Sequence, residues 1–285
     1  MNLDLGTLIN SLWIFLFLLL FLVPQMQRSS LNYSRRRVLT SLARRRKSTV
    51  ITLIHRQETI SFLGIPISKY IDIDDSEEVL RAIRLAPKDT PIDLILHTPG
   101  GIALAATQIA FALKAHKGKK TVMVPHYAMS GGTLIALAVD EIIMDPQAVL
   151  GPVDPQLGDQ TGSYPATSLI NVLKQKKIDK IDDKTLVMAD QAKKAISQMK
   201  DTVKHLLKGR YSDDRVDHIV EELVSGKYTH DFPITVEETC SLFGECVKTD
   251  LPEEVYALMS LYRMETRPKR PSVEYVPVAP TGKGY

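Results

Sequence analysis

Two glycine pairs stand at the ends of two successive apolar segments, and a serine precedes the second pair. Gly100 and Gly101 follow the segment 92–97. Ser130 stands directly before the pair 131–132, which begins 31 residues after the first pair. A serine that opens a helix between glycines presents its hydroxyl group, and free backbone N–H groups beside it can stabilise an oxyanion. Each pair alone is explained by a tight turn, but the two together predict a site for nucleophilic catalysis by Ser130.

The elements that position these residues are predicted from the hydrophobic pattern, which alternates between strands and helices from about residue 48 onward. We expect strands at 49–55, 92–97, 121–125 and 141–144, two strand pieces within 60–67, and helices at 75–85, 102–116 and 130–139. Such alternation implies a parallel sheet with helices packed on it. Parallel strands end at one edge, where open α/β sheets bind their ligands, so both glycine pairs are expected at that edge.

The second half of the chain has a different pattern. Residues 151–164 are rich in loop formers, and residues 168–184 are polar and rich in lysine. Helices are expected after them, at 185–208, 213–225 and 236–243. Residues 266–285 combine repeated proline with basic side chains and are predicted to be a disordered tail.

The two glycine motifs carry a resemblance to known enzymes. Thr-Pro-Gly-Gly at 98–101 and Ala-Met-Ser-Gly-Gly-Thr at 128–133 resemble the pattern shared by Clp protease subunits, signal peptide peptidase A and NfeD-type membrane serine proteases. The most similar family is that of the serine dehydrogenase proteinases, and the resemblance spans about residues 60–250. It implies an α/β fold with a Clp protease/crotonase-like ββα spiral core, in a serine peptidase domain over 48–265.

The resemblance also implies roles for site residues. Ser130 would form an acyl-enzyme during hydrolysis of peptide bonds, and the N–H groups of Gly100 and Gly131 would form the oxyanion hole. Where Clp-type enzymes carry a histidine, this chain carries Asp154, and the stretch comparable to that of the family's acid carries His230. We therefore expect a triad in a changed chain order, with His230 as general base and Asp154 orienting it, because triads are defined by geometry and role.

A Ser–Lys dyad, as in signal peptide peptidases, is the alternative arrangement. Lys174 and Lys177 are the candidates for its general base, within a run that holds further lysines at 176, 180 and 184. A catalytic lysine must be desolvated enough to be neutral, whereas a run so rich in charge is more often a solvated face. The sequence therefore favours the histidine over the lysines and leaves the lysines open.

The remaining residues argue against other kinds of site. No cluster of His, Cys and carboxylate predicts a metal site, no cofactor is implied, and no phosphate-binding loop motif occurs. Cys240 and Cys246 lack zinc-ligand spacing and are interpreted as reduced thiols. The formal net charge of +3 averages a basic segment and a mildly acidic body, which argues against nucleic-acid binding. Four histidines are interpreted as surface or helix-face residues: His55, His116, His205 and His218.

The N-terminal region predicts a membrane anchor. Residues 8–24 are 17 residues without a charge, and the segment from Arg28 to Lys47 holds eight basic side chains and no acidic one. We expect one transmembrane helix within 1–27, followed by a basic juxtamembrane segment over 28–47 that contacts anionic membrane lipid. Basic residues favour the cytoplasmic side, so the expected localisation is a single-pass membrane protein with a cytoplasmic catalytic domain.

The resemblance implies partners as well as an activity. It implies a homo-oligomer whose substrates are unfolded or membrane-proximal polypeptides. Two functions of other classes stay open. A crotonase-like acyl-CoA enzyme would share the fold and the oxyanion N–H groups but would use a carboxylate base and need no serine nucleophile. A non-catalytic membrane-bound scaffold would keep the fold without a base, an interpretation favoured by the unusual Asp154.

Overall fold

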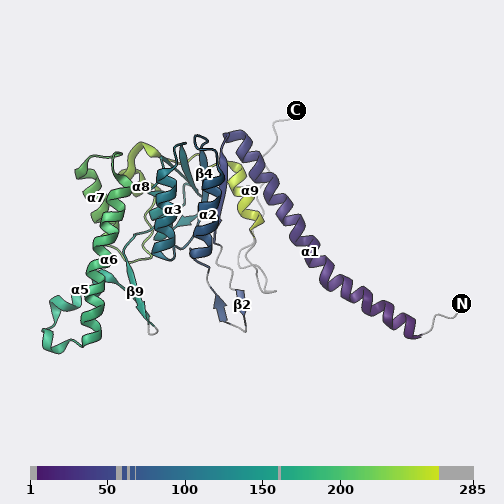
Figure 1. The fold of residues 1–285 in the computed structure, drawn as a ribbon, viewed down its shortest axis with the longest axis horizontal. Helices are drawn as coiled ribbons and strands as arrows, with labels where there is room; N and C mark the ends of the chain where they lie inside the picture. The colour runs from purple at the N-terminus through teal and green to yellow at the C-terminus, as the bar shows by residue number, and fades with distance from the viewer. Residues whose placement is uncertain (1–4, 56–59, 63–64, 68, 160–161, 263–285) are drawn as a thin grey trace, which may run out of the picture.

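A parallel sheet forms the centre of the molecule. The computed structural model of the chain describes residues 5–55, 60–62, 65–67, 69–159 and 162–262 (Figure 1). The strands of the sheet lie in the order β1-β4-β5-β7-β11, and every pair of neighbours is parallel. Their bounds are β1 (Thr49–Ile54), β4 (Ile92–His97), β5 (Lys120–Val124), β7 (Glu141–Met144) and β11 (Val247–Lys248). The α/β fold with a parallel sheet is therefore confirmed.

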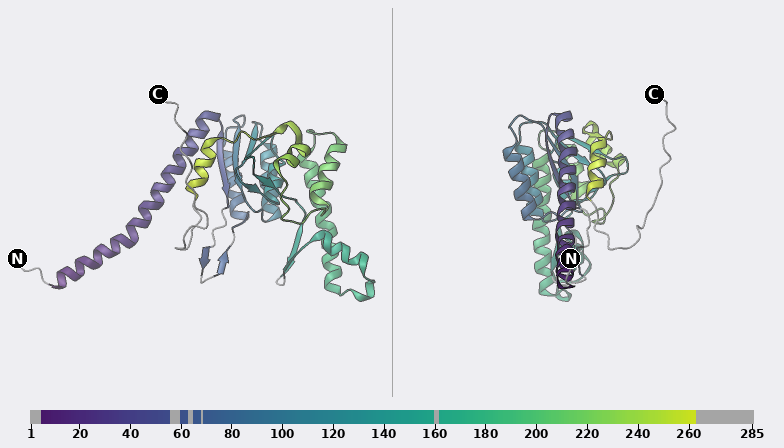
Figure 2. Two further views of the ribbon diagram at one scale, coloured as in Figure 1. Left: turned by 180° about the vertical axis from the view of Figure 1, so that it is seen from behind. Right: turned by 90° about the vertical axis from the view of Figure 1, so that its right-hand side faces the viewer.

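Helices cover both faces of this sheet, which explains why its strands are continuous apolar runs. Every residue of β4 is buried. Successive side chains point to opposite faces, so Leu94 and Leu96 join one cluster of buried residues and Ile95 joins another. The first face packs against α2 (Ile73–Leu85), α3 (Ala103–Ala115) and α4 (Gly131–Ala136). The second packs against α1 (Leu5–Arg46) and α9 (Glu253–Leu261), and the right-hand view of Figure 2 shows α9 opposite α2.

The C-terminal part of α1 is a structural element of the body. Leu42 is buried against α9 and the second face of the sheet. The Arg35 guanidinium donates two hydrogen bonds, of 3.2 and 2.8 Å, to the carbonyl oxygen of Leu261 at the end of α9. Arg46 forms an ion pair of 2.7 Å with buried Asp93 of β4. Part of the basic segment 28–47 thus fastens α1 to the sheet.

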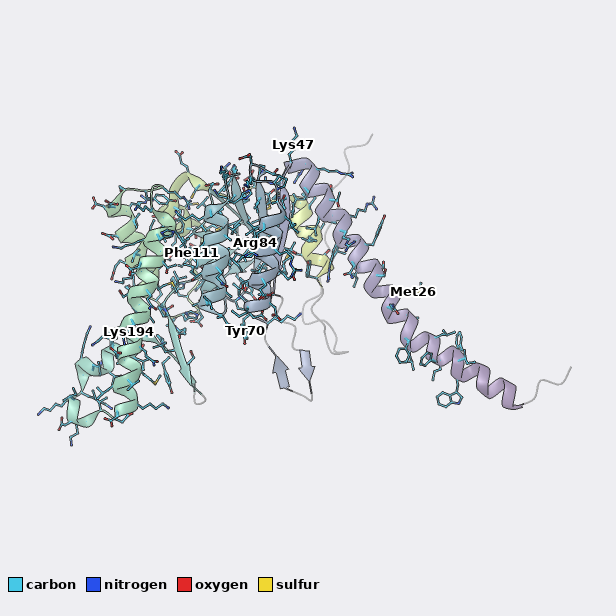
Figure 3. The ribbon with its side chains drawn as sticks, in the orientation of Figure 1. Met26, Lys47, Tyr70, Arg84, Phe111 and Lys194 are labelled. Carbon is cyan, nitrogen blue, oxygen red and sulfur yellow. The ribbon has the colours of Figure 1, made fainter. Side chains whose placement is uncertain are left out.

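The predicted membrane anchor is wrong. In the described part of the chain, none of the helices has both the length and the apolar character needed to cross a bilayer. The uncharged stretch 8–24 spans about 25 Å as a helix, which is less than the hydrocarbon core of about 30 Å. It continues without a break into the arginine-rich end of α1. The prediction of a single-pass membrane protein with a transmembrane helix in 1–27 is therefore corrected. Figure 3 shows that the part of α1 around Met26 extends away from the rest of the protein.

The second half of the chain adds helices to one end of the sheet. The helices expected over 185–208, 213–225 and 236–243 are confirmed as α6 (Asp183–Leu207), α7 (Asp213–Val224) and α8 (Val236–Phe243). The lysine-rich run was not expected to be helical, yet it contains most of α5 (Ala166–Gln175) and the short 3₁₀ turn η1 (Ile178–Lys180). A second 3₁₀ turn, η2 (Gly244–Cys246), leads into β11. The predicted tail 266–285 lies outside the described residues.

The carboxyl edge of the sheet is flanked by projecting elements. Hairpin β2–β3 (Ile60–Phe62, Ile65–Ile67), hairpin β9–β10 (Gln156–Asp159, Gly162–Pro165) and α5 with the start of α6 extend beyond this edge (Figures 1 and 2). Short strands β6 (Tyr127–Ala128) and β8 (Val149–Leu150) also pair beyond the main sheet. The residues that the sequence singles out for chemistry lie in the loops beside these elements, since the first glycine pair follows β4, Ser130 follows β6 and Asp154 lies between β8 and β9.

Candidate functional site

Ser130 has a strained backbone at the start of α4. It is the N-cap residue of that helix, with φ 49° and ψ −112°. Within the described residues, only Lys47 shares a positive φ among those that are not glycine. Such a conformation costs of order 1–3 kcal/mol and persists only where neighbouring structure enforces it. Here the Met129 N–H donates to the carbonyl oxygen of Thr98, and the Gly132 N–H donates to that of Met129.

The first glycine pair lies directly against Ser130, as its position after β4 predicts. Gly100 has φ +105°, and a Cβ built on it would stand 2.8 Å from Cβ of Ser130. Gly101 has φ +155°, and a Cβ there would stand 2.2 Å from the carbonyl oxygen of Ile71. Neither position has room for a side chain. Glycine is therefore required for the loop to pass between Ser130 and Ile71.

The two N–H groups of this glycine pair have different surroundings. The Gly100 N–H donates to Oγ1 of Thr98 at 3.2 Å, so it is already engaged within the loop. The amide nitrogen of Gly101 lies 3.6 Å from the position that a Cβ on Gly131 would occupy. In the described part of the chain, neither the Gly101 N–H nor the Gly131 N–H donates to a protein acceptor. The geometry thus favours Gly101 over the predicted Gly100 as the partner of Gly131.

His230 and Asp154, which are 76 residues apart, lie in contact. Nδ1 of His230 lies 2.8 Å from Oδ1 of Asp154. The Asp154 side chain is 1% exposed, and that of His230 is 35% exposed. The second carboxylate oxygen of Asp154 accepts a hydrogen bond of 2.6 Å from Nε2 of Gln156. The contact with Asp154 occupies Nδ1 of His230 and leaves Nε2 of the imidazole available, which is the geometry of an acid that orients a base.

A chain of backbone contacts holds this pair near α4. The N–H of Leu150 donates to the carbonyl oxygen of Ile234 and the reverse bond is also present, so the segment before Asp154 pairs with the segment after His230. Oγ1 of Thr133, three residues after Ser130, accepts from the Gly151 N–H and donates to a backbone oxygen nearby. The segments that carry the predicted nucleophile, acid and base are thus linked to one another by hydrogen bonds.

The lysines of the alternative dyad have different surroundings. Lys174 lies in the last turn of α5 and Lys177 precedes η1, and both side chains are exposed. An exposed ammonium group keeps its hydration, whereas a lysine base must lose it to become neutral. The lysine run is thus a solvated surface, as its charge density suggests.

One histidine was misinterpreted from the sequence. His55 was expected at the surface, but it is 6% exposed at the end of β1. Burial lowers its pKa below the ordinary value of 6.5, although the nearby charge of Asp75 acts in the opposite direction. The signal that could have placed it is its position directly after a strand of a sheet covered on both faces. Among the described residues, no group of His, Cys or carboxylate side chains has the arrangement of a metal site.

Comparisons with known proteins agree with the sequence motifs. The chain is 56% identical over 272 residues to the protein named "Uncharacterized protein MJ0137" of Methanocaldococcus jannaschii, covering 95% of this chain and 93% of that protein. It is similar to the structure of a mutant of the 1510-N membrane-bound stomatin-specific protease, with 21% identity, a TM-score of 0.48, and coverage of 73% of this chain and 82% of the other.

Another similar structure is ClpP1 from Listeria monocytogenes, with 12% identity, a TM-score of 0.45, and coverage of 75% of this chain and 98% of that one. The family described as ClpP-like SDH-type serine proteinase matches residues 1–284, which is nearly the whole chain. The strained serine, the glycine loop and the His–Asp pair all lie within that match. The chain therefore belongs to the family of ClpP-like SDH-type serine proteinases.

Proposed function

We propose that the chain is a serine endopeptidase in which Ser130 is the nucleophile, His230 the general base and Asp154 the residue that orients the base. The observation that carries this proposal is the 2.8 Å contact between His230 and buried Asp154. Family membership and the strained backbone of Ser130 support it. The strain favours a functional role for Ser130, because strained backbones cluster at functional sites.

The proposed reaction follows from these positions. Nε2 of His230 accepts the hydroxyl proton as Oγ of Ser130 attacks the carbonyl carbon of the scissile peptide bond. The resulting oxyanion accepts hydrogen bonds from the N–H groups of Gly131 and Gly101. His230 then donates the proton to the leaving amine, which forms the acyl-enzyme. Water, deprotonated by His230, hydrolyses the ester and restores Ser130.

The proposed substrates are polypeptides, and the proposed assembly is a homo-oligomer. Membership of a family of ClpP-like serine proteinases supports a peptide substrate for this chain. The hairpins and the α5–α6 pair project beyond the carboxyl edge of the sheet (Figure 1), and the first glycine pair follows β4 at that edge. They provide elements against which a polypeptide or a second subunit could pack.

Active-site labelling tests this function directly. We expect a fluorophosphonate probe to modify purified protein at Ser130, as mapped by mass spectrometry, and Ser130→Ala to abolish the modification. Asp154→Asn and His230→Ala should lower peptide hydrolysis by about 10³- to 10⁴-fold, because each removes one member of a triad.

Two outcomes would redirect the proposal. Full activity in His230→Ala, together with an inactive Lys174→Ala or Lys177→Ala variant, would assign the base to a lysine. Absence of labelling in folded wild-type protein would refute the serine peptidase.

A further inference from the structure

A second hydrogen-bonded series of acid, histidine and hydroxyl, formed by Asp75, His55 and Thr98, lies outside the proposed triad. Nε2 of His55 lies 3.1 Å from Oδ2 of Asp75, and Nδ1 of His55 lies 3.0 Å from Oγ1 of Thr98. Thr98 is fully buried and His55 nearly so. A buried hydroxyl cannot contact a substrate, so this series is not a second catalytic triad. Its last member, Thr98, contacts the loop that carries the first glycine pair.

The hydrogen-bonded series joins residues from three elements. His55 follows β1, Thr98 follows β4, and Asp75 lies in the first turn of α2, where it completes a capping box with Asp72. Thr98 in turn accepts the hydrogen bond from the Gly100 N–H at 3.2 Å. The end of β1, the start of α2 and the glycine loop are thereby connected through side chains.

The directions of these hydrogen bonds follow from the chemistry of the groups. A carboxylate of Asp75 can only accept, so the His55 proton sits on Nε2. In the neutral imidazole, Nδ1 is then an acceptor, and the single Thr98 hydroxyl proton points to it at 3.0 Å rather than to the carbonyl oxygen of Gly100 at 3.3 Å. Oγ1 of Thr98 keeps a lone pair free, which accepts from the Gly100 N–H. Burial lowers the pKa of His55 and so favours this neutral form. The charges of Asp75 and Asp72 raise the pKa, and Lys69 lowers it, but burial has the largest effect.

The glycine loop needs such a restraint. Gly100 and Gly101 both have positive φ, a region in which glycine has many accessible conformations. Two backbone bonds, from the Ile71 N–H to the Gly100 oxygen and from the Ile102 N–H to the Ile71 oxygen, hold one side of the loop. The Thr98 hydroxyl holds the other side, where it binds the Gly100 N–H.

We propose that His55 and Thr98 are positioning residues, which tie down the Gly100 N–H so that the Gly101 N–H stays directed toward Ser130. Asp75 fixes the imidazole tautomer for this purpose. The inference rests on the proposed function, because it assigns the Gly101 N–H to the oxyanion hole. Loss of the Thr98 hydroxyl leaves the Gly100 N–H without its acceptor and frees the peptide group between Pro99 and Gly100 to rotate. The bond from the Ile71 N–H to the Gly100 oxygen then alone orients the next peptide group, which carries the Gly101 N–H.

Two matched pairs of variants test this role. Thr98→Val removes the hydroxyl with little change of shape, and Thr98→Ser keeps it. His55→Leu removes the acceptor, and the smaller His55→Asn supplies an amide oxygen in the place of Nδ1 while giving up the contact of Nε2 with Asp75. We expect Thr98→Val and His55→Leu to lower kcat at least about 10-fold with KM within about two-fold, because an oxyanion donor acts on the transition state. The Ser and Asn variants should stay within about three-fold of wild type.

The labelling rate and hydrogen exchange complete the test. Fluorophosphonate labelling of Ser130 should slow in parallel with kcat, and the Gly100 amide should exchange faster in Thr98→Val than in wild type. Wild-type kcat and labelling in a folded Thr98→Val would overturn the inference while leaving the peptidase intact. If wild-type protein is not labelled at all, the proposed function fails. The exchange rate of Gly100 then decides alone whether Thr98 restrains the loop.

Discussion

The carboxylate of Asp154 is held on both of its oxygens, by His230 on one and by Gln156 on the other. A buried carboxylate needs such partners, because burying a charge without hydrogen bonds is costly. Gln156 opens β9, so the bond also links the proposed triad to the hairpin that flanks the site. An amide in this place can fix the plane of the carboxylate without changing its charge.

Gln156→Ala should therefore impair the triad without removing any member of it. We expect kcat for peptide hydrolysis to fall about 10-fold with KM nearly unchanged, because the misoriented base acts only in the chemical step. Gln147→Ala is the matched control, since Gln147 is exposed and remote from Asp154 in the described contacts. Equal kcat values for the two variants would show that Gln156 does not orient Asp154.

Gly101 and Gly209 provide a comparison of two kinds of glycine. Both have positive φ, but a Cβ on Gly101 would collide with the backbone of Ile71, whereas a Cβ on Gly209 would meet nothing within 4 Å. Gly209→Ala should cost about 1–2 kcal/mol for its backbone conformation alone. Gly101→Ala should cost clearly more and should lower labelling of Ser130. Urea unfolding of both variants measures the difference, and equal costs would contradict the close packing of Gly101.

At this scale the sequence predicts residue types better than it predicts orientations. The glycine pairs and Ser130 could be selected from motifs and their spacing, whereas His230 and Asp154 could be proposed only through the resemblance to Clp-type enzymes. The choice between Gly100 and Gly101 could not, because it depends on the rotation of a single peptide group. The burial of His55 was missed because its partners, Asp75 and Thr98, are distant in the sequence, and its position directly after a buried strand was its one local signal.

The C-terminal end of α1 contributes to stability through its packing against α9 and the sheet. Leu42 is 1% exposed between α9 and the sheet, whereas Leu20 of the same helix is 65% exposed. Leu42→Ala should cost roughly 2–5 kcal/mol, since it leaves a cavity in the core. Leu20→Ala should change the free energy of unfolding by less than about 0.5 kcal/mol. Chemical denaturation of both variants checks this, and equal effects would mean that α1 does not stabilise the body.

The elements differ in how well they can be predicted. Strands β1, β4, β5 and β7 are short apolar runs bounded by turn residues, and a sheet covered on both faces requires that pattern. The sequence does not predict helix α9, because it has only nine residues and lies near the C-terminal end of the predicted domain. The apolar face of α9 is explained only by its packing against α1 and the sheet. The anchor was mispredicted because the absence of charge over residues 8–24 was given more weight than the shortness of the stretch, and none of the described helices is long and apolar enough to cross a bilayer.

Across the whole molecule, two buried ionisable groups at opposite edges of the sheet make stability depend on pH. His55 lies at the carboxyl edge, where burial lowers its pKa. Glu141 opens β7 at the amino edge. Burial raises its pKa, but hydrogen bonds from Lys248 and Lys119 outweigh this and hold the pKa below the ordinary 4.5. In each case the unfolded chain binds a proton more readily than the folded one, so acid favours unfolding.

The two groups act in different pH windows. The contribution of neutral His55 is complete above its unfolded pKa of 6.5 and is lost as the pH falls below that value. The contribution of ionised Glu141 is complete above 4.5 and is lost below it. Urea midpoints measured between about pH 7.5 and about pH 4 should therefore fall first near 6.5 and again near 4.5. His55→Asn should flatten only the first step and Glu141→Gln only the second. A first step of unchanged size in His55→Asn would assign it to another group and contradict the burial of a neutral His55.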